Sequence, residues 1–418
     1  MRKHLLLALV LLSVACSGIE GANQRVDAAP DCLAAAAPWR DLELAPTVET
    51  AARGTDPLLR AVTINLHSGM GQVKGLWSRR ANVERRLNEI AAAIAAGGVE
   101  PVDIVALNEV DAFASRSGGI DQARFLAEAL QEQSGVAYAV VHGQTRAGMF
   151  PTLDGSFGNA VLVRHTIAAS QACLFDDLGA CGIADAPAGM PALRAGGLVQ
   201  RALREGRGAI KLTLDFHGRP LDVIVTHLEA VALPEREAQA SHLLRRLVDP
   251  ARSTVVLGDI NAVPANMTRA RRFFASDRTH DILTSGSLAD VRVLHDARLG
   301  RDDFSVWATY PALAPVLALD TAFASLDLVP HEARVMELLD TDHRGFAVTY
   351  RLTRDARLIA AQRARHDAIR RRQLAQILAC DSAGSRTATL DWLRAGTHFL
   401  GLPGAAPVVT SRTTAAAL

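Results

Sequence analysis

A carboxylate and an amide stand two residues apart in the segment 253–264, whose sequence is STVVLGDINAVP. The Val- and Thr-rich residues before them favour a β-strand, so Asp259 and Asn261 are expected at its end. Held side by side there, an acid and an amide can bind a metal ion, a water molecule or a phosphate oxygen. Asp and Asn are also common turn residues, so the pair gains meaning only from its companions.

Further polar residues stand at the ends of other predicted strands. They are Asn65, Glu109, Asn159, His227, Asp320, Asp342 and His343. Each one alone has an ordinary structural explanation, such as a turn asparagine, a solvated acid, a buried histidine or a cap. If the strand ends meet on one rim of a sheet, however, the same side chains form a single site.

Nine runs rich in Val, Ile, Leu and Thr are predicted as the strands that position these residues. They cover residues 61–66, 102–107, 137–141, 159–163, 208–216, 221–227, 254–259, 319–325 and 346–352. Residues 217–220 join two of the runs as a hairpin, which predicts an antiparallel pair. Apolar residues at helical spacing predict helices near 83–94 and at 234–249. Strands and helices mixed in this way indicate a layered α/β fold.

Composition sets the outer limits of the interpretation. A chain of 418 residues with 49% hydrophobic content can bury one large core or two smaller ones. The 45 Lys and Arg residues nearly balance the 44 Asp and Glu residues. No global field therefore draws the protein to nucleic acid or to an anionic membrane, and any binding of a polyanion must be local.

The first sixteen residues predict export. A basic start is followed by the apolar run 5–15, which is shorter than the roughly 20 residues of a membrane span. Residues 1–16 therefore read as a signal peptide, and Cys16 resembles the lipidated cysteine of a bacterial lipoprotein, although Ser13 stands where that pattern prefers Leu. The expected location is periplasmic or in the cell envelope as a lipoprotein, otherwise secreted, with 17–58 as a flexible tether.

The other cysteines form an even set: Cys32, Cys173, Cys181 and Cys380. In an oxidising compartment they can form disulfides, with Cys173 and Cys181 the favoured pair and Cys32 with Cys380 a second option. Ordinary buried thiols are the alternative. Because no Cys/His spacing typical of zinc is present, metal chemistry must come from oxygen ligands.

Six ordered segments resemble the signature blocks of the endonuclease/exonuclease/phosphatase superfamily of metal-dependent phosphoesterases. They are TINLHSG (63–69), VDIVALNEVD (102–111), VTHLEA (225–230), GDIN (258–261), LDTAFAS (319–325) and TDHRG (341–345). The resemblance also includes 115–130, 155–165 and 308–320, and it predicts a domain at 59–353. It implies an α/β (α+β), DNase I-like fold: a four-layered α/β/β/α sandwich of two mostly antiparallel sheets, with the site at one open end and a C-terminal helical extension beyond it.

The resemblance further implies a divalent cation, Mg²⁺ first and Mn²⁺ or Ca²⁺ as alternatives, held by Asn65, Glu109 and Asp342. His343 would pair with Asp320 and act as general base or as a phosphate contact. Asp259 would orient or deprotonate the attacking water; the choice of base between Asp259 and His343 stays open.

Four further residues are implied as contacts to the phosphate. His227, counted with the catalytic residues, would donate a hydrogen bond to it, as would Asn159 and Asn261. Arg207 stands where the family carries a similar RGA segment and would bind phosphate, although a surface ion pair explains it equally well.

Two departures from the family are visible. Thr321 follows Asp320 where the family commonly has His or Tyr. The extension 354–418 begins with arginines interleaved with apolar residues at roughly helical spacing. A basic helix of this kind can lie on a membrane or guide a polyanion, but more often packs its apolar side on the domain.

The sequence therefore predicts an exported Mg²⁺-dependent phosphoesterase that cleaves a phosphoester by metal-assisted attack of water. Its substrate would be nucleic acid, a phospholipid headgroup or a small phosphodiester, and no protein partner is implied. The segments 65–69 and 116–122 resemble small hydrolases and phosphodiesterases more than abasic-site nucleases. The alternative is a catalytically impaired envelope protein that binds a phosphate-bearing ligand, with Thr321 as its support.

Overall fold

The computed structural model describes residues 57–72, 77–98, 100–147, 155–175, 181–182, 206–262, 277–299, 304–338 and 340–382. The predicted signal peptide, nearly all of the tether and the end of the C-terminal extension lie outside these ranges. Export, lipidation of Cys16 and the outer domain boundaries therefore stay predictions.

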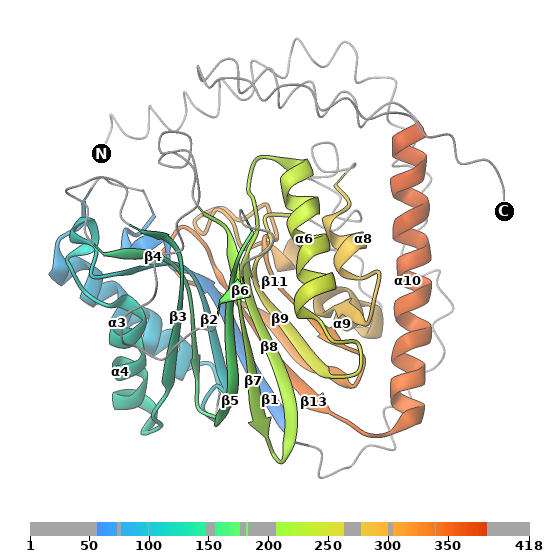
Figure 1. Ribbon diagram of the computed structural model, residues 1–418, viewed down its shortest axis with the longest axis horizontal. Helices are drawn as coiled ribbons and strands as arrows, with labels where there is room; N and C mark the ends of the chain where they lie inside the picture. Colours follow the sequence, from blue (N-terminus) through green and yellow to red (C-terminus); the bar gives the residue numbers. More distant parts are fainter. Residues whose placement is uncertain are drawn as a thin grey trace.

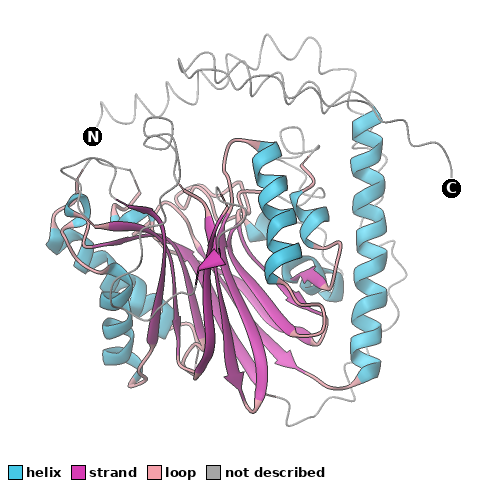
Figure 2. Ribbon diagram, viewed as in Figure 1, coloured by secondary structure: helices cyan, strands magenta, loops and turns pink. Residues whose placement is uncertain are grey.

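Two sheets form the centre of the molecule (Figures 1 and 2). One has the strand order β12-β13-β1-β2-β4-β3 and the other β10-β11-β9-β8-β7-β5-β6. The strands are β1 (Leu58–Asn65), β2 (Ile104–Ala112), β3 (Ala139–Ala147), β4 (Ser156–Val163), β5 (Ile167–Leu174), β6 (Cys181–Gly182), β7 (Gly208–Phe216), β8 (Arg219–His227), β9 (Ser253–Asp259), β10 (Leu288–Asp290), β11 (Asp320–Ser325), β12 (Leu328–Met336) and β13 (Gly345–Leu352). All the strands predicted from the sequence are present.

Neighbouring strands are antiparallel except for the pairs β1–β2 and β8–β9. The predicted hairpin is β7–β8, in which Phe216 pairs with Arg219. His217 and Gly218 between them have φ values of 53° and 74°. Two positive φ angles in a two-residue loop match the right-handed twist of the flanking strands.

Helices cover the outer face of each sheet. The helices of the described part are α3 (Arg80–Ala95), α4 (Gln122–Ser134), α6 (Leu233–Leu247), α8 (Thr279–Leu283), α9 (Val291–Leu299) and α10 (Ala356–Ser382), with short 3₁₀ helices η2 (His67–Gly69), η3 (Ser115–Ser117) and η4 (Phe304–Trp307). Of these, α9 adds Val291, Val293 and Leu294 to the core between the sheets. The helices α3 and α4 pack on the first sheet, and α6 and α8 pack on the second. The predicted α/β/β/α sandwich with a C-terminal helix is therefore confirmed.

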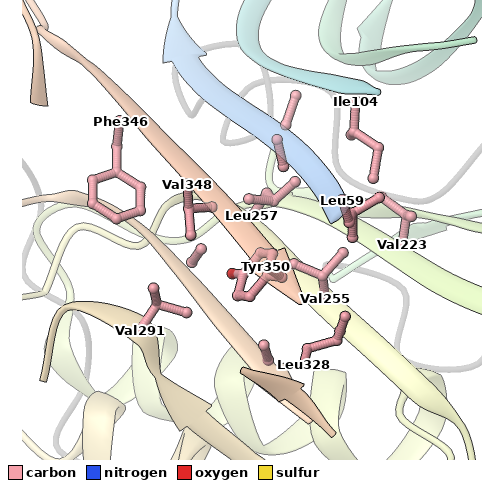
Figure 3. Packing of buried hydrophobic residues seen from close by; sticks show 14 of the residues in the cluster. Leu59, Ile104, Val223, Val255, Leu257, Val291, Leu328, Phe346, Val348 and Tyr350 are labelled. Atoms are coloured by element: carbon pink, nitrogen blue, oxygen red, sulfur yellow. The ribbon is translucent and has the colours of Figure 1, made fainter. Parts of the chain in front are cut away.

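Alternate residues of the same strand enter different cores. Leu59, Leu257 and Tyr350 are fully buried between the sheets (Figure 3), while Ile64 and Val256 face the helical layers. Because both faces of the central strands are covered, their sequences are continuous apolar runs instead of alternating ones. Full burial of each such side chain stabilises the fold by about 1.5–3 kcal/mol.

The C-terminal helix α10 packs on α8 and α9. Its buried positions are Gln362, His366 and Ile369, and Arg370 Nη2 lies 3.5 Å from Asp281 Oδ1. The packing expected for this helix is present, but the inward face of its described part is more polar than expected. No helix of the described part has the length and apolarity needed to span a membrane.

Cys173 in β5 is disulfide-bonded. The β5–β6 ladder places Cys181 opposite Cys173, as the predicted pairing requires. Cys32 lies outside the described residues, as does the side chain of Cys380, so the second pairing stays a prediction.

A buried ion pair anchors the start of β11. Arg292 is fully buried; its Nη2 donates to Asp290 Oδ2 at 2.9 Å and its Nη1 to the carbonyl oxygen of Ala318 at 2.8 Å. Burial opposes the charge on Asp290, but Arg292 and His280 outweigh it and hold the pKa of Asp290 far below its usual range. The pair therefore fixes the backbone that leads directly into Asp320.

Replacing Asp290 by Asn should lower the free energy of unfolding by about 3–5 kcal/mol at pH 7, because Arg292 would be buried without its counter-charge. The folded-state pKa of Asp290 is lowered, so its stabilisation is present above the unfolded pKa near 4 and is lost as pH falls below it. Urea unfolding should show a wild-type advantage that narrows below about pH 4. The exposed Asp249→Asn variant should show no such loss, and a neutral Asp290→Asn result would contradict the account.

Candidate active site

One end of the sandwich gathers every predicted site residue. The carboxyl ends of β1, β2, β8 and β9 meet the amino ends of the antiparallel strands β4, β7, β11 and β13 there. In Figure 1 this is the upper end of the sheets, where β8 leads into α6. Loops at a sheet end can present polar groups without breaking the apolar layers beneath them.

Asn65, at the end of β1, joins two carboxylates. Its Nδ2 donates to Glu109 Oε1 at 3.2 Å and to Asp259 Oδ2 at 3.1 Å. Its Oδ1 accepts the backbone N–H of His67 at 2.9 Å, and Thr341 Oγ1 donates to its carbonyl oxygen at 2.7 Å. Asn65 is thus placed beside Glu109 as predicted, and it also holds Asp259.

Glu109 stands on an irregularity of β2. The register with β4 shifts between Leu107 and Val110, and Glu109 has a φ of 53°. A left-handed residue other than glycine costs on the order of 1–3 kcal/mol, so it persists only where its surroundings fix it. The bulge leaves Glu109 partly exposed at the rim while Asn108 beside it is fully buried.

The sequence analysis missed Asn108. Its Oδ1 accepts the backbone N–H of Asp259 at 2.9 Å, and its Nδ2 donates to Asn159 Oδ1 at 2.9 Å and to the Thr226 carbonyl oxygen at 3.0 Å. Asn159 in turn donates to the Gly208 carbonyl oxygen at 3.0 Å. Asn108 therefore links the two sheets directly beneath the site, and an asparagine directly after the apolar run 102–107 was the signal that could have revealed it.

Gly258 makes this approach of the sheets possible. Its φ is 148°, and a Cβ there would collide with the Thr226 carbonyl oxygen and come within 3.3 Å of Asn108 Oδ1. Only glycine fits such a backbone without strain. The glycine of the GDIN segment is thus required by the packing that positions Asp259.

Asp259 and Asp320 both face His343. His343 Nδ1 lies 2.8 Å from Asp320 Oδ2, the pairing that the family resemblance implies, and His343 Nε2 lies 3.7 Å from Asp259 Oδ2. Burial raises the pKa of Asp259 to about 6; His343 opposes this and Asp320 adds to it. Burial disfavours protonation of His343, but Asp320 and Asp259 outweigh it and raise the imidazole pKa to about 10.

His227 lies on the other side of Asp259, with its Nε2 3.5 Å from Asp259 Oδ2. Asn261, whose φ is 52°, places its Nδ2 3.0 Å from His227 Nε2. Arg207 Nη1 lies 2.7 Å from His227 Nδ1, and its Nε lies 3.8 Å from Glu229 Oε2. Arg207 is 6% exposed, so its ion pair with Glu229 is largely buried beside His227 and does not lie on the open surface.

Asp342 lies at the edge of the site, beside a residue that the sequence analysis did not single out. His67 Nδ1 is 3.3 Å from Asp342 Oδ1 and 2.8 Å from the Gly71 carbonyl oxygen. Burial raises the pKa of Asp342, and the charge of Glu109 adds to the rise. His67 and Ser68 have positive φ values of 49° and 54°.

The 115–130 segment holds this strained turn in place. Arg116 Nη2 donates to Ser68 Oγ at 3.0 Å, and Gln122 Nε2 donates to the Ser68 carbonyl oxygen at 2.8 Å. Arg116 is itself fixed by both carboxylate oxygens of Asp111, at 2.8 and 2.6 Å. A bidentate pair of this kind orients the guanidinium rigidly, so the segment supports the site from beneath.

The donor set fits a hard divalent cation. Glu109 and Asp342 offer carboxylate oxygens, whereas the predicted ligand Asn65 turns its amide nitrogen toward Glu109 and its Oδ1 toward the His67 N–H. Burial, together with neighbouring carboxylates, raises the pKa values of Asp259 and Asp342. A second arrangement exists, because ligand atoms of Asp259, Asp320 and His343 lie within 4.8 Å of one another. A cation there would compete with the hydrogen bond between His343 and Asp320, so we favour the position at Glu109.

Thr321 does not disturb this arrangement. It is fully buried in β11 and pairs with Gly258 in the ladder between β11 and β9. The neighbouring Asp320 keeps its contact with His343. The substitution therefore offers little support for a catalytically impaired protein.

Several solved structures are similar to this chain. Similar solved structures include an endonuclease/exonuclease/phosphatase from Beutenbergia cavernae (20% identity, covering 71% of this chain and 72% of that chain, TM-score 0.46). A family protein from Leptotrichia buccalis (17%, 70% and 99%, 0.48) and D. rerio TDP2 complexed with single-strand DNA product (14%, 71% and 99%, 0.45) are also similar. At these scores the likeness says nothing about substrate.

No curated protein matches the chain significantly. The model of the Endonuclease/Exonuclease/phosphatase family matches residues 62–343, which is well over half of the chain and includes every site residue described above. The chain belongs to the endonuclease/exonuclease/phosphatase family of metal-dependent phosphoester hydrolases.

Proposed function

We propose that the protein is an exported, Mg²⁺-dependent phosphoesterase that cleaves its substrate by attack of a water molecule. The main observation in support of this reaction is that Asn65, His227 and His343 all lie close to Asp259 Oδ2. The signal-like residues 1–16 support export, and Cys16 supports attachment to the cell envelope. Oxygen ligands at Glu109 support Mg²⁺ as the metal.

In this proposal Asp259 accepts the proton of the attacking water. Asn65 fixes one carboxylate oxygen, Oδ2, and the backbone N–H of Asn261 donates to the other at 3.0 Å. The 3.7 Å between Asp259 Oδ2 and His343 Nε2 exceeds a direct hydrogen bond. Both groups can therefore contact one small group placed between them, such as water or a phosphate oxygen.

His343 serves as a contact to the phosphate and Asp320 keeps its ring in place, since Nδ1 is engaged and Nε2 points toward Asp259. His227, Asn261 and Arg207 form the opposite wall and stabilise charge on the phosphoryl oxygens. When bound at Glu109, a divalent cation supplies further stabilisation of the phosphoryl and leaving oxygens. Asn159, whose amide nitrogen donates to Gly208, supports the wall from beneath.

Turnover of bis(p-nitrophenyl) phosphate tests the reaction. Wild-type protein should hydrolyse it with Mg²⁺ and lose the activity in EDTA, and Asp259→Asn and His343→Gln should each lower kcat at least about 100-fold. Asp249→Asn, an exposed carboxylate near the end of α6, should behave as wild type. Equal turnover in all variants, with and without EDTA, would sink the enzyme proposal.

Glu109→Gln tests the metal position separately. Removing one negative oxygen ligand should raise the Mg²⁺ concentration for half-maximal activity by about 10–100-fold. Calorimetric titration of Mn²⁺ should show the same loss of affinity without any substrate. The exposed Glu132→Gln variant in α4 is the control, and unchanged Mn²⁺ affinity in Glu109→Gln would place the metal elsewhere.

Asn108→Ala tests the link beneath the site. It should lower kcat by about 10–100-fold with little change in KM, because Asp259 loses the group that fixes its backbone N–H. Its stability should also fall by about 1–3 kcal/mol, since the amide of Asn159 loses a partner in a buried place. A variant that loses stability but keeps the full kcat would show that Asn108 has only a structural role.

A further inference from the structure

Six large hydrophobic side chains are exposed among the described residues, and all of them lie in connections at the active-site end. They are Trp77, Phe113, Val231, Val306, Leu313 and Val316. Trp77 is 63% exposed and Leu313 is 70% exposed. At the opposite end, the described β7–β8 hairpin presents His217 and Gly218 instead.

These six residues, which we call the apolar rim, come from four connections. Trp77 precedes α3, Phe113 follows β2, Val231 lies between β8 and α6, and the other three lie between α9 and β11. Scattered exposed apolar residues are ordinary, but their confinement to one end is not. Because each of these connections leads to or from a strand end at the site, the apolar rim lies at the same end of the sandwich as the site.

Part of the apolar rim is built directly onto the catalytic residues. The backbone N–H of Ala312, next to Leu313, donates to the Asp342 carbonyl oxygen at 2.7 Å. The backbone N–H of Val316 donates to the Tyr310 carbonyl oxygen at 2.9 Å, and the Tyr310 ring centroid is 4.8 Å from that of His343. Leu313 and Val316 therefore lie in a connection whose neighbouring residues contact the site.

Another part of the apolar rim, at Trp77, is linked to the turn at Ser68 through Arg116. The backbone N–H of Ser78, next to Trp77, donates to the Arg116 carbonyl oxygen at 2.7 Å, and Arg116 also holds Ser68. Arg79 is exposed two residues from Trp77. An indole beside a long cationic side chain suits a lipid–water interface, where the ring lies at headgroup level and the cation meets phosphate.

We infer that the apolar rim docks the active-site end onto a lipid surface, so that the phosphoester to be cleaved belongs to a lipid in that surface. This inference rests on the proposed function, and it names a class of substrate for the same site. Four of the six side chains are aliphatic and cannot stack on bases, which argues against single-stranded nucleic acid. The chain's net charge of +1 likewise offers no general attraction to a polyanion.

Vesicle binding tests the inference. The full-length chain would be floated with phosphatidylcholine vesicles, whose headgroups carry no net charge. It would carry Cys16→Ser, so that lipidation at that residue cannot contribute to binding. Leu313→Asp and Val231→Asp place a charge in two different connections of the apolar rim. Each should lower the partition coefficient about tenfold, whereas His217→Asp at the opposite end should not change it.

Hydrolysis of bis(p-nitrophenyl) phosphate by the same proteins separates the two proposals. Vesicle binding that falls in both rim variants while turnover of the soluble diester is retained supports docking by the apolar rim. Docking by the apolar rim would be overturned if the rim variants bind vesicles as well as the His217→Asp control does. It would also be overturned if the rim variants lose binding to a single-stranded oligonucleotide while their vesicle binding is unchanged. A parent protein that lacks diester turnover would refute the proposed function, and flotation would still decide the docking.

Discussion

The burial of the Asp259 carboxylate at the meeting point of the two sheets is the constraint on which the rest of the site depends. A buried carboxylate is expensive unless hydrogen bonds and charge compensate it. Asn65 and the backbone N–H of Asn261 donate hydrogen bonds to the carboxylate, Asn108 accepts the backbone N–H of Asp259 itself, and His343 supplies a facing cationic group. The strained backbone of Glu109 and the close contact at Gly258 serve the same placement.

These groups compensate only part of the cost of burying the Asp259 carboxylate, and the remaining cost makes the carboxylate a better proton acceptor. Amide contacts orient a carboxylate without neutralising it, and the pKa of Asp259 stays raised, at about 6. Asp342 is raised as well. A site that is crowded with acids and held rigidly by neutral groups is suited to a divalent cation, and rigid placement is what lets such a site act without reorganising during the reaction.

Much of this architecture could be predicted from the sequence, because fully buried strands leave continuous apolar runs whose ends are marked by polar residues. The runs at 208–216 and 254–259 correspond closely to β7 and β9. The strands β5, β6, β10 and β12 were not predicted; β6 and β10 have only two and three residues, and β12 contains Pro330, at a break in its register with β13.

The polar contacts that cross from one element to another could not be predicted. Asn108 stands directly after the apolar run 102–107, but its role depends on which strands lie next to it in the fold. His67 gains its contact with Asp342 only because the chain turns sharply there. The inward face of α10 likewise uses Gln362 and His366, which helical periodicity of apolar residues does not reveal.

The central claim is that a divalent cation binds at Glu109 and leaves Asp259 free to accept the proton of the attacking water. An anomalous difference map from crystals grown with Mn²⁺ measures this most directly. The account predicts a peak bonded to the Glu109 carboxylate and adjacent to Asn65 and Asp342, with the contact between His343 and Asp320 preserved. A peak bonded instead to Asp259, Asp320 and His343, with none at Glu109, would contradict it.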